Sequence, residues 1–221
     1  MKKKLTTLKP AWNVYQVWGL ILLVWVLYRY YIRFPEWADE FIFKPLIFVI
    51  PVAWYVINYE KRPLESLGLT FKNFFKSVYI GLFYGLLFAV EGLLVNYFKN
   101  GTISINPIEA YYQYGIVLLL ILSLATAYSE ELLSRGFVFG RIYEEKKNLW
   151  YAAILSTLMF VALHIPILVL SLKLTGATMV IFFVTDFLLG LVNAFLYFNT
   201  RSLVAPILVH VFWNMTVALY L

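Results

Sequence analysis

Residues 116–135 read IVLLLILSLATAYSEELLSR, so a long apolar run ends in two adjacent acids and an arginine. About 20 consecutive apolar residues are needed to span the hydrocarbon core of a bilayer as one helix. An ionisable residue inside such a span costs roughly 3 kcal/mol on insertion scales, so it is a candidate functional residue by default. This stretch therefore predicts a transmembrane helix that carries charge for a chemical or structural purpose.

The composition of the whole chain is also that of a membrane protein. Of its 221 residues, 62% are hydrophobic and only 14% are charged, which is more apolar surface than a soluble domain of this size can bury. The sequence predicts an all-α fold, a polytopic transmembrane helix bundle of about seven spans. Pro45 and Pro51 are expected to kink the second span. The predicted spans are residues 12–32, 41–59, 74–98, 113–134, 149–170, 177–198 and 203–221.

Lysine and arginine are divided unevenly between the two sides of this predicted bundle. One side holds 13 of the 18 and the other holds 4, while Lys44 lies within a span. The positive-inside rule then predicts a cell-membrane protein with a cytoplasmic N-terminus and an external C-terminus. The basic excess need not indicate nucleic acid, because in membrane proteins it usually reflects cytoplasmic loops and anionic lipid. The larger set is Lys2, Lys3, Lys4, Lys9, Lys61, Arg62, Lys72, Lys76, Arg135, Arg141, Lys146, Lys147 and Arg201, and the smaller set is Arg29, Arg33, Lys99 and Lys173.

Two adjacent acids in the fourth span form the first of three motifs. Glu131 and Arg135 are four residues apart, so they share a helix face and can pair. Glu130 is rotated by about 100° from Glu131 and is expected to remain unpaired. The sequence therefore predicts one neutralised carboxylate and one that is available for chemistry.

The only two histidines of the chain form the other two motifs. His164 follows Phe160 by four residues, and His210 precedes Asn214 by four. At 1.5 Å per residue, these side chains and Glu130 lie at similar depths. We expect them to share one polar cavity in the cytoplasmic half of the bundle.

Such a set of side chains can hydrolyse an amide bond. Glu130 would act as general base toward a water held with His164. His210 and Asn214 would donate hydrogen bonds to the oxyanion that forms. The alternative is a zinc ion bound by Glu130, His164 and His210, with water in an open position.

The three motifs resemble EExxxR, FxxxH and HxxxN of the CPBP (Abi) family of intramembrane proteases. That family includes the type II CAAX prenyl endopeptidases and bacterial relatives linked to bacteriocin processing and immunity. The resemblance implies that Glu130 activates water with His164, and that His210 and Asn214 form the oxyanion site. A metal-independent glutamate mechanism is favoured, without a cofactor, and zinc is the alternative. By the same resemblance the supporting residues are Glu131, Arg135 and Phe160.

The chain is predicted to have two parts. Residues 1–112 would form three spans with a cytoplasmic loop and no family motif, and residues 113–221 would form the four-span protease core. The expected function is an endopeptidase acting on a membrane-associated peptide or protein. The alternatives are a non-catalytic immunity or sensor scaffold of the same fold and a transporter that relays protons. Glu91 and Asp186 lie in spans without a motif and are interpreted as structural or cavity-lining residues.

Overall fold

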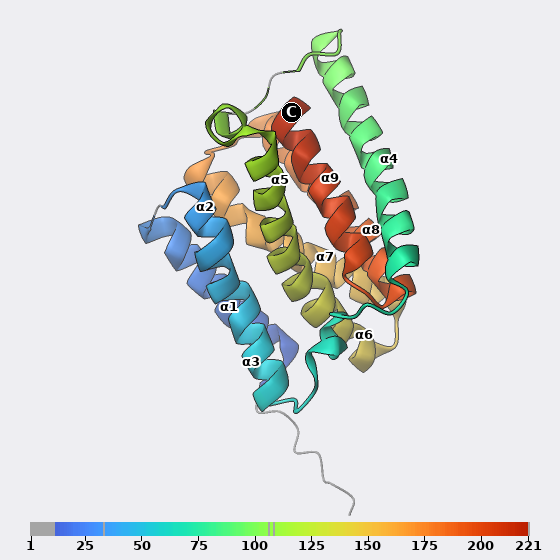
Figure 1. The fold of residues 1–221 in the computed structure, drawn as a ribbon. Helices are drawn as coiled ribbons and strands as arrows, with labels where there is room; N and C mark the ends of the chain where they lie inside the picture. Colours follow the sequence, from blue (N-terminus) through green and yellow to red (C-terminus); the bar gives the residue numbers. More distant parts are fainter. Residues whose placement is uncertain (1–11, 33, 106, 108, 221) are drawn as a thin grey trace, which may run out of the picture.

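A computed structural model describes residues 12–32, 34–105, 107 and 109–220, and within them the chain forms helices and no strand (Figure 1). Four π-helical segments continue these helices at Asp39–Phe43, Pro45–Val49, Leu132–Phe139 and Ile167–Ser171, and a 3-10 turn covers Leu64–Leu67. The α-helices are α1 (Val14–Tyr31), α2 (Glu36–Ala38), α3 (Ile50–Asn58), α4 (Phe74–Asn100), α5 (Glu109–Glu131), α6 (Gly140–Lys146), α7 (Leu149–Pro166), α8 (Gly176–Thr200) and α9 (Val204–Tyr220).

These elements make seven helical segments, which confirms the predicted fold class. Among the described residues, five segments are long and apolar enough to cross a membrane, and α1 and the shorter apolar helix Val204–Leu219 complete the set. The protein is a multi-pass membrane protein. The five are Glu36–Asn58, Phe74–Phe98, Tyr111–Lys146, Leu149–Leu170 and Thr178–Thr200.

The fourth segment is longer than the sequence predicted. It was expected to stop at residue 134, before Arg135, but it continues as one apolar helical segment to Lys146. The reason is that every residue of Leu132–Phe139 is buried, Arg135 included. The charge of Arg135 therefore does not mark a membrane surface, because the side chain has a partner inside the bundle.

Two prolines of the second segment do not interrupt it. Each lies in the first turn of its element, Pro45 in Pro45–Val49 and Pro51 in α3, and the chain stays helical from Glu36 to Asn58. A proline in a first turn loses a hydrogen bond that such a position often lacks anyway. Two π-helical segments lie on either side of Lys44, and such segments can themselves bend a helix.

Connections between the helices gather at two ends of the bundle (Figure 1). We call the end formed by residues 59–73, 147–148 and 201–203 the basic end. The opposite end is formed by residues 34–35, 101–105 and 172–175 and by the last turn of α9. The basic end holds Lys61, Arg62, Lys72, Lys147 and Arg201. Other residues of the charge count, Lys2, Lys3, Lys4, Lys9 and Arg33, lie outside the described residues.

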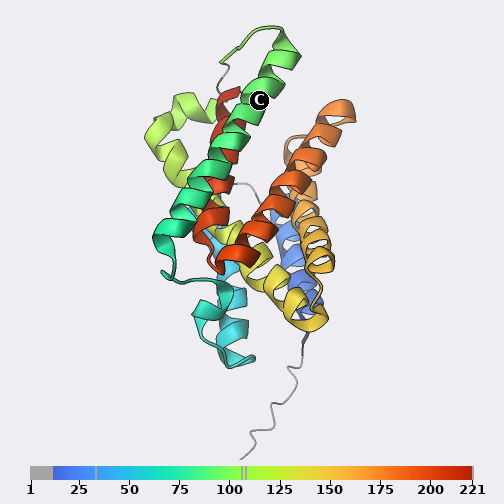
Figure 2. The same cartoon turned by 90° about the vertical axis from the view of Figure 1, so that its right-hand side faces the viewer.

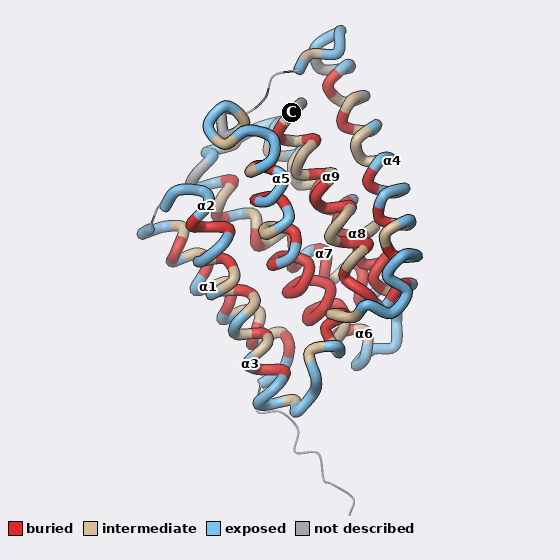
Figure 3. Tube along the Cα trace, viewed as in Figure 1, coloured by how far each residue is buried: buried red, intermediate tan, exposed pale blue. Residues whose placement is uncertain are grey.

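The core of the bundle is built from both predicted parts of the chain. One cluster of buried residues combines α1 and α3 with the segment Leu132–Phe139, α7 and α8. Helix α4 lies along α9 at one edge of the molecule, and α9 also packs on α5 and α8 (Figures 1 and 2). The buried positions concentrate where α5, α7 and α9 meet (Figure 3). The middle of the bundle is therefore where the three motifs come together.

Candidate active site

The carboxylate of Glu131 lies at the centre of the site and is fully buried. One oxygen accepts a hydrogen bond from Asn193 Nδ2 at 3.0 Å and lies 2.8 Å from His210 Nδ1. The other oxygen lies 3.2 Å from Arg135 Nε. The predicted pairing of Glu131 with Arg135 is therefore present, and it is extended by two further partners from α8 and α9.

Glu130 is not the unpaired carboxylate that the sequence predicted. Its Oε1 lies 3.0 Å from Lys44 Nζ, a side chain with only 5% of its surface exposed. Its Oε2 faces two imidazole nitrogens, His164 Nε2 at 3.5 Å and His210 Nε2 at 3.6 Å. The prediction missed Lys44 because that residue belongs to the half of the chain without a motif.

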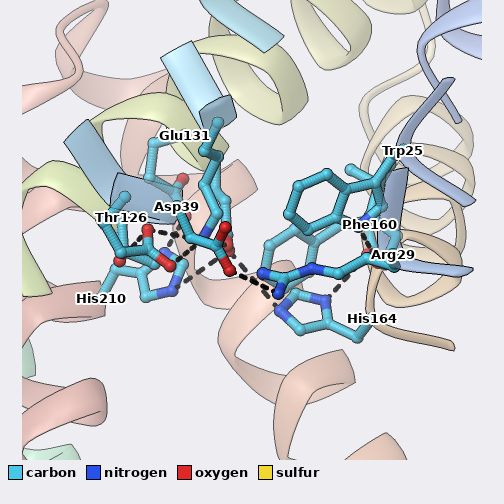
Figure 4. Close-up of polar contacts among 12 residues, drawn as sticks. Trp25, Arg29, Asp39, Thr126, Glu131, Phe160, His164 and His210 are labelled. Carbon is cyan, nitrogen blue, oxygen red and sulfur yellow. Dashed lines mark hydrogen bonds and ion pairs between the residues drawn. The ribbon is translucent and has the colours of Figure 1, made fainter. Parts of the chain in front are cut away.

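Both imidazole rings are oriented through their Nδ1 atoms. His210 Nδ1 faces the carboxylate of Glu131, and His164 Nδ1 lies 3.1 Å from the carbonyl oxygen of Phe160 (Figure 4). Both partners accept hydrogen bonds and cannot donate them, so each Nδ1 carries the proton. In the neutral rings, Nε2 then presents a lone pair toward Glu130. Neutral rings would thus bring three acceptor atoms together, with Glu130 Oε2 at 3.5 and 3.6 Å from the two Nε2 atoms.

Phe160 does more than fill space. Its ring lies edge-on to His164 and to His210, with centroids 4.7 and 5.9 Å apart. The guanidinium of Arg135 sits 4.3 Å from the centroid of the same ring. A cation over an aromatic face is stabilised by the ring quadrupole, and more so when it is desolvated. Phe160 therefore links the cation of the first motif to the rings of the other two.

A cavity of about 270 Å³ lies beside these groups. Glu130, His164 and Asn214 all line it, and His164 keeps 22% of its side-chain surface exposed. His210 lies behind them and is nearly completely buried. Asn214 thus faces the cavity, one turn further along α9. His210 faces Glu131 instead, so His210 and Asn214 are not placed for the joint oxyanion role expected of them.

The turn that carries His164 is held from outside the motifs. The backbone N–H of Ile167 bonds to the carbonyl of His164, three residues back, where a regular α-helix would use the carbonyl of Leu163, four residues back. Trp25 Nε1 of α1 donates to that Leu163 oxygen at 3.0 Å. The first helix therefore supports the geometry of the second motif.

The N-terminal half also supplies a charged network at the cavity. Lys44 Nζ lies 2.7 Å from Glu40 Oε2, and Thr126 donates to Glu40 at 2.5 Å. Nearby, Asp39 pairs with Arg29 at 2.7 Å (Figure 4). Asp39 also accepts a hydrogen bond from the Tyr28 hydroxyl. The sequence signal that could have indicated this network is the spacing of four between Glu40 and Lys44 within one span.

Glu91 and Asp186, the two acids in spans without a motif, have different surroundings. Asp186 Oδ2 lies 3.9 Å from His164 Nδ1, so its carboxyl group is one of the polar groups around the site. Glu91 lies in an apolar cleft between α4 and α8, together with Phe88 and Leu188, away from the motifs. The interpretation of Asp186 as a polar residue of the cavity region thus agrees with its position, and Glu91 stays outside the site.

The site has some of the chemistry of a metal centre but not its arrangement. Two imidazole nitrogens and a carboxylate oxygen suit zinc, and fixed Nδ1 atoms are usual for histidine ligands. Within the described part of the chain, however, no group of three His, Asp or Glu side chains is arranged to hold a metal ion. The ammonium of Lys44 on Glu130 would also repel a second cation. The residues as arranged therefore do not fit a preformed zinc site.

A comparison with protein families matches the part of the chain that holds all three motifs. The model for type II CAAX prenyl endopeptidase Rce1-like proteins matches residues 112–216, just under half of the chain. Residues 112–216 are thus similar to this family. The resemblance to CPBP (Abi) proteases is thereby confirmed. No curated protein and no solved structure matches the chain. Lys44, Glu40 and Trp25 lie outside the Rce1-like segment, yet they contact it at the site.

Replacing Arg135 with alanine is expected to destabilise the protein strongly. The substitution leaves the fully buried Glu131 without its cation, and breaking a buried pair typically costs about 3–5 kcal/mol. Thermal unfolding of the purified protein in detergent measures the effect. The matched control is Arg62→Ala, because Arg62 pairs with Glu144 at 2.6 Å with both side chains 44% exposed, and such surface pairs contribute roughly 0–1 kcal/mol. Equal melting temperatures for Arg135→Ala and wild type would contradict the buried pair.

Proposed function

We propose that the protein is an intramembrane endopeptidase that hydrolyses a peptide bond of a membrane-associated peptide or protein by means of water activated by Glu130. The observation that carries the proposal is the convergence of Glu130 Oε2 with the Nε2 atoms of His164 and His210 beside a cavity. The Rce1-like family of residues 112–216 supports hydrolysis as the reaction class. All residues of the three motifs are present in the chain.

The proposed first step is the attack of water on the scissile carbonyl. A water among the three acceptor atoms can donate one proton to Glu130 and the other to an imidazole nitrogen. Glu130 takes a proton as the water oxygen bonds to the carbonyl carbon, and the carbonyl electrons move to the oxygen. Glu130 then returns this proton to the departing amine as the carbon–nitrogen bond breaks. The products are a carboxylic acid and an amine, and no covalent enzyme intermediate forms.

The negative charge on the carbonyl oxygen requires a hydrogen-bond donor. Asn214 lines the cavity with Glu130, and its side-chain amide has two N–H donors. We assign the oxyanion role to Asn214. The expected partnership with His210 changes, because the Nδ1 atom of His210 faces Glu131 and its Nε2 faces Glu130. His210 is better placed to hold the attacking water than to bind the oxyanion.

Lys44 is proposed as a positioning residue for the base. Its ammonium binds Glu130 Oε1, which leaves Oε2 directed at the histidines. The same ammonium binds Glu40, so its place does not depend on Glu130 alone. A fixed cation beside the base orients the carboxylate before substrate arrives, and preorganised groups contribute most to catalysis because they need not rearrange.

The proposal takes the metal-free form of the mechanism. Two observations support it: the residue arrangement does not match a metal site among the described residues, and Lys44 already supplies positive charge to Glu130. No step of the proposed reaction runs through a metal ion.

Glu130→Gln is expected to abolish peptide cleavage while the protein remains folded. Glutamine keeps the shape of the side chain but cannot accept the proton from water. Turnover of a membrane-peptide library, followed by mass spectrometry of the products, is the measurement. The control is Glu91→Gln, which changes a partly buried carboxylate in the α4–α8 cleft and should leave turnover intact. Undiminished turnover by the Glu130→Gln protein would exclude Glu130 as the base.

Lys44→Met should lower kcat with little change in KM. A hydrogen bond to a charged group contributes about 1.5–3 kcal/mol, which corresponds to roughly 10- to 100-fold in rate if it is lost in the transition state. Lys44→Arg keeps the cation and should recover part of the loss. Kinetics are measured only on protein that elutes as a folded species, so that a lower yield of folded protein does not affect the measured kcat. A normal kcat for folded Lys44→Met would show that this residue is only structural.

Chelation is expected to leave activity unchanged. A purified sample incubated with a strong zinc chelator and then freed of it should cleave at the rate of an untreated sample. Metal content is measured on the same samples. If the treated protein lost activity and stoichiometric zinc restored it, the metal-free mechanism would be wrong, and Glu130, His164 and His210 would become the ligands.

A further inference from the structure

The catalytic cavity extends toward one end of the bundle only. From Glu130 its lining continues to Glu36, the first residue of α2, and to Arg29, two residues before the end of α1. On other helices it reaches Ile167, just after α7, and Ala218, near the end of α9. All four positions lie at the ends of their helices that face away from the basic end (Figure 1). Glu36 is exposed, so this is the side on which the cavity reaches the surface.

The basic end is closed beneath the site. The segment between α3 and α4 turns inward, so that Leu67 is fully buried. Its backbone lies so close to Gly136 that a Cβ at that glycine would stand 2.6 Å from the Leu67 oxygen. The backbone N–H of Leu203 also donates to the carbonyl of Gly68 at 3.1 Å. No residue of 59–73, 147–148 or 201–203, all of which the structure describes, lines the cavity.

Hydrogen bonds and ion pairs hold this closing segment in place. Arg141 binds the carboxylate of Glu60 through two nitrogens, with distances of 2.6 to 2.9 Å, and its Nη2 reaches Ser66 Oγ at 3.1 Å. Arg141 itself is buried. Ser202 adds a hydrogen bond to the carbonyl of Thr70 at 3.4 Å. The basic end therefore offers a substrate no path to Glu130.

The expectation of a cavity in the basic half of the bundle is wrong for this reason. Counting residues along each span placed Glu130, His164 and His210 at compatible depths, and they do meet. Counting residues could not show on which side of these three side chains the bundle is filled by other side chains. Large buried side chains at Leu132–Phe139 occupy the basic side, and the open volume lies on the other.

We propose that the protein takes its substrate from the extracytoplasmic side of the membrane. This inference rests on the proposed function for the reaction, and on the charge distribution for the side. Lys and Arg favour cytoplasmic loops, and among the described residues the closed basic end holds Lys61, Arg62, Lys72, Lys147 and Arg201. The substrate class is then a peptide segment that enters or leaves the bilayer on the extracytoplasmic side, such as an exported peptide or the juxtamembrane part of a membrane protein.

Access from the extracytoplasmic side does not suit the cleavage of prenylated CAAX tails, the activity for which the Rce1-like family is named. A CAAX tail is the C-terminus of a protein that is prenylated at the cysteine, and such tails lie in the cytosol. A cytosolic tail would meet the closed basic end of this protein. The cavity side, and not the three motifs, thus decides which peptides can be cleaved.

Cysteine labelling tests the inference without requiring activity, because the chain contains no cysteine. Ser123→Cys introduces a thiol into the cavity wall with a small change of shape, and Glu36→Cys introduces one at its mouth. Lys147→Cys and Lys72→Cys, both exposed at the basic end, are the matched controls. Each variant is treated with a small, charged, membrane-impermeant thiol reagent, once in intact cells and once in inside-out vesicles. Thermal unfolding of each purified variant confirms that it is folded.

The expected result is opposite labelling of the two pairs. Ser123→Cys and Glu36→Cys should react in intact cells, and Lys147→Cys and Lys72→Cys only in inside-out vesicles. Reaction of Ser123→Cys in vesicles alone, together with the controls, would show that the cavity opens at the basic end and would overturn the inference. Reaction of both controls in intact cells would overturn it as well, since the orientation would be inverted. Failure of the proposed function appears elsewhere, as the absence of turnover in protein that labels as expected.

Discussion

The buried carboxylate of Glu131 is the constraint on which the rest of the site depends. It is fully enclosed and contacts Arg135 on its own segment, Asn193 on α8 and His210 on α9. A charge at this depth costs several kcal/mol unless it is paired and hydrogen-bonded. If the three helices separated or rotated, Glu131 would lose these partners, and the free-energy cost of its buried charge would no longer be offset. Because His210 is oriented by Glu131, its other nitrogen is directed at Glu130. The acid that the proposed reaction does not use therefore sets the geometry of the acid that it does use.

Charge balance ties the two halves of the chain together. The Rce1-like segment brings Glu130, Glu131 and Asp186 to one place, and the arginine that it places beside them, Arg135, is paired with Glu131. Lys44 from the second helical segment supplies the cation for Glu130. The family motifs alone are therefore not a complete site in this protein. A relative that keeps all three motifs but has a different N-terminal half would place different charged groups around the residue equivalent to Glu130.

The sequence predicted the features that follow from hydropathy and from spacing within one helix. The seven spans and the Glu131–Arg135 pair are of this kind, since each depends on periodicity or on segment length. The meeting of the three motifs was expected from their similar depths and from the family resemblance. Lys44 could not be found in this way, because it is 86 positions from Glu130 and pattern does not show which helices are neighbours. The π-helical segments on both sides of it also change the direction of its side chain from that of a regular helix. The direction of the cavity depends on how the segment 60–70 folds under the bundle, and no local pattern contains that.

The ion pairs of the first two segments have a consequence for biogenesis. Arg29 pairs with Asp39, and Lys44 pairs with Glu40, so each of these buried charges has a partner within the first 44 residues. N-terminal segments are synthesised first and meet the membrane before the later ones exist. The opening hairpin can thus enter the lipid with its interior charges already neutralised, and it need not wait for Glu130. When the fourth segment inserts, Glu130 pairs with Lys44, which is already paired with Glu40. The indole N–H of Trp25 is then available to donate to the Leu163 carbonyl of the fifth segment. The half of the chain without a recognisable motif is in this sense the template on which the Rce1-like half assembles.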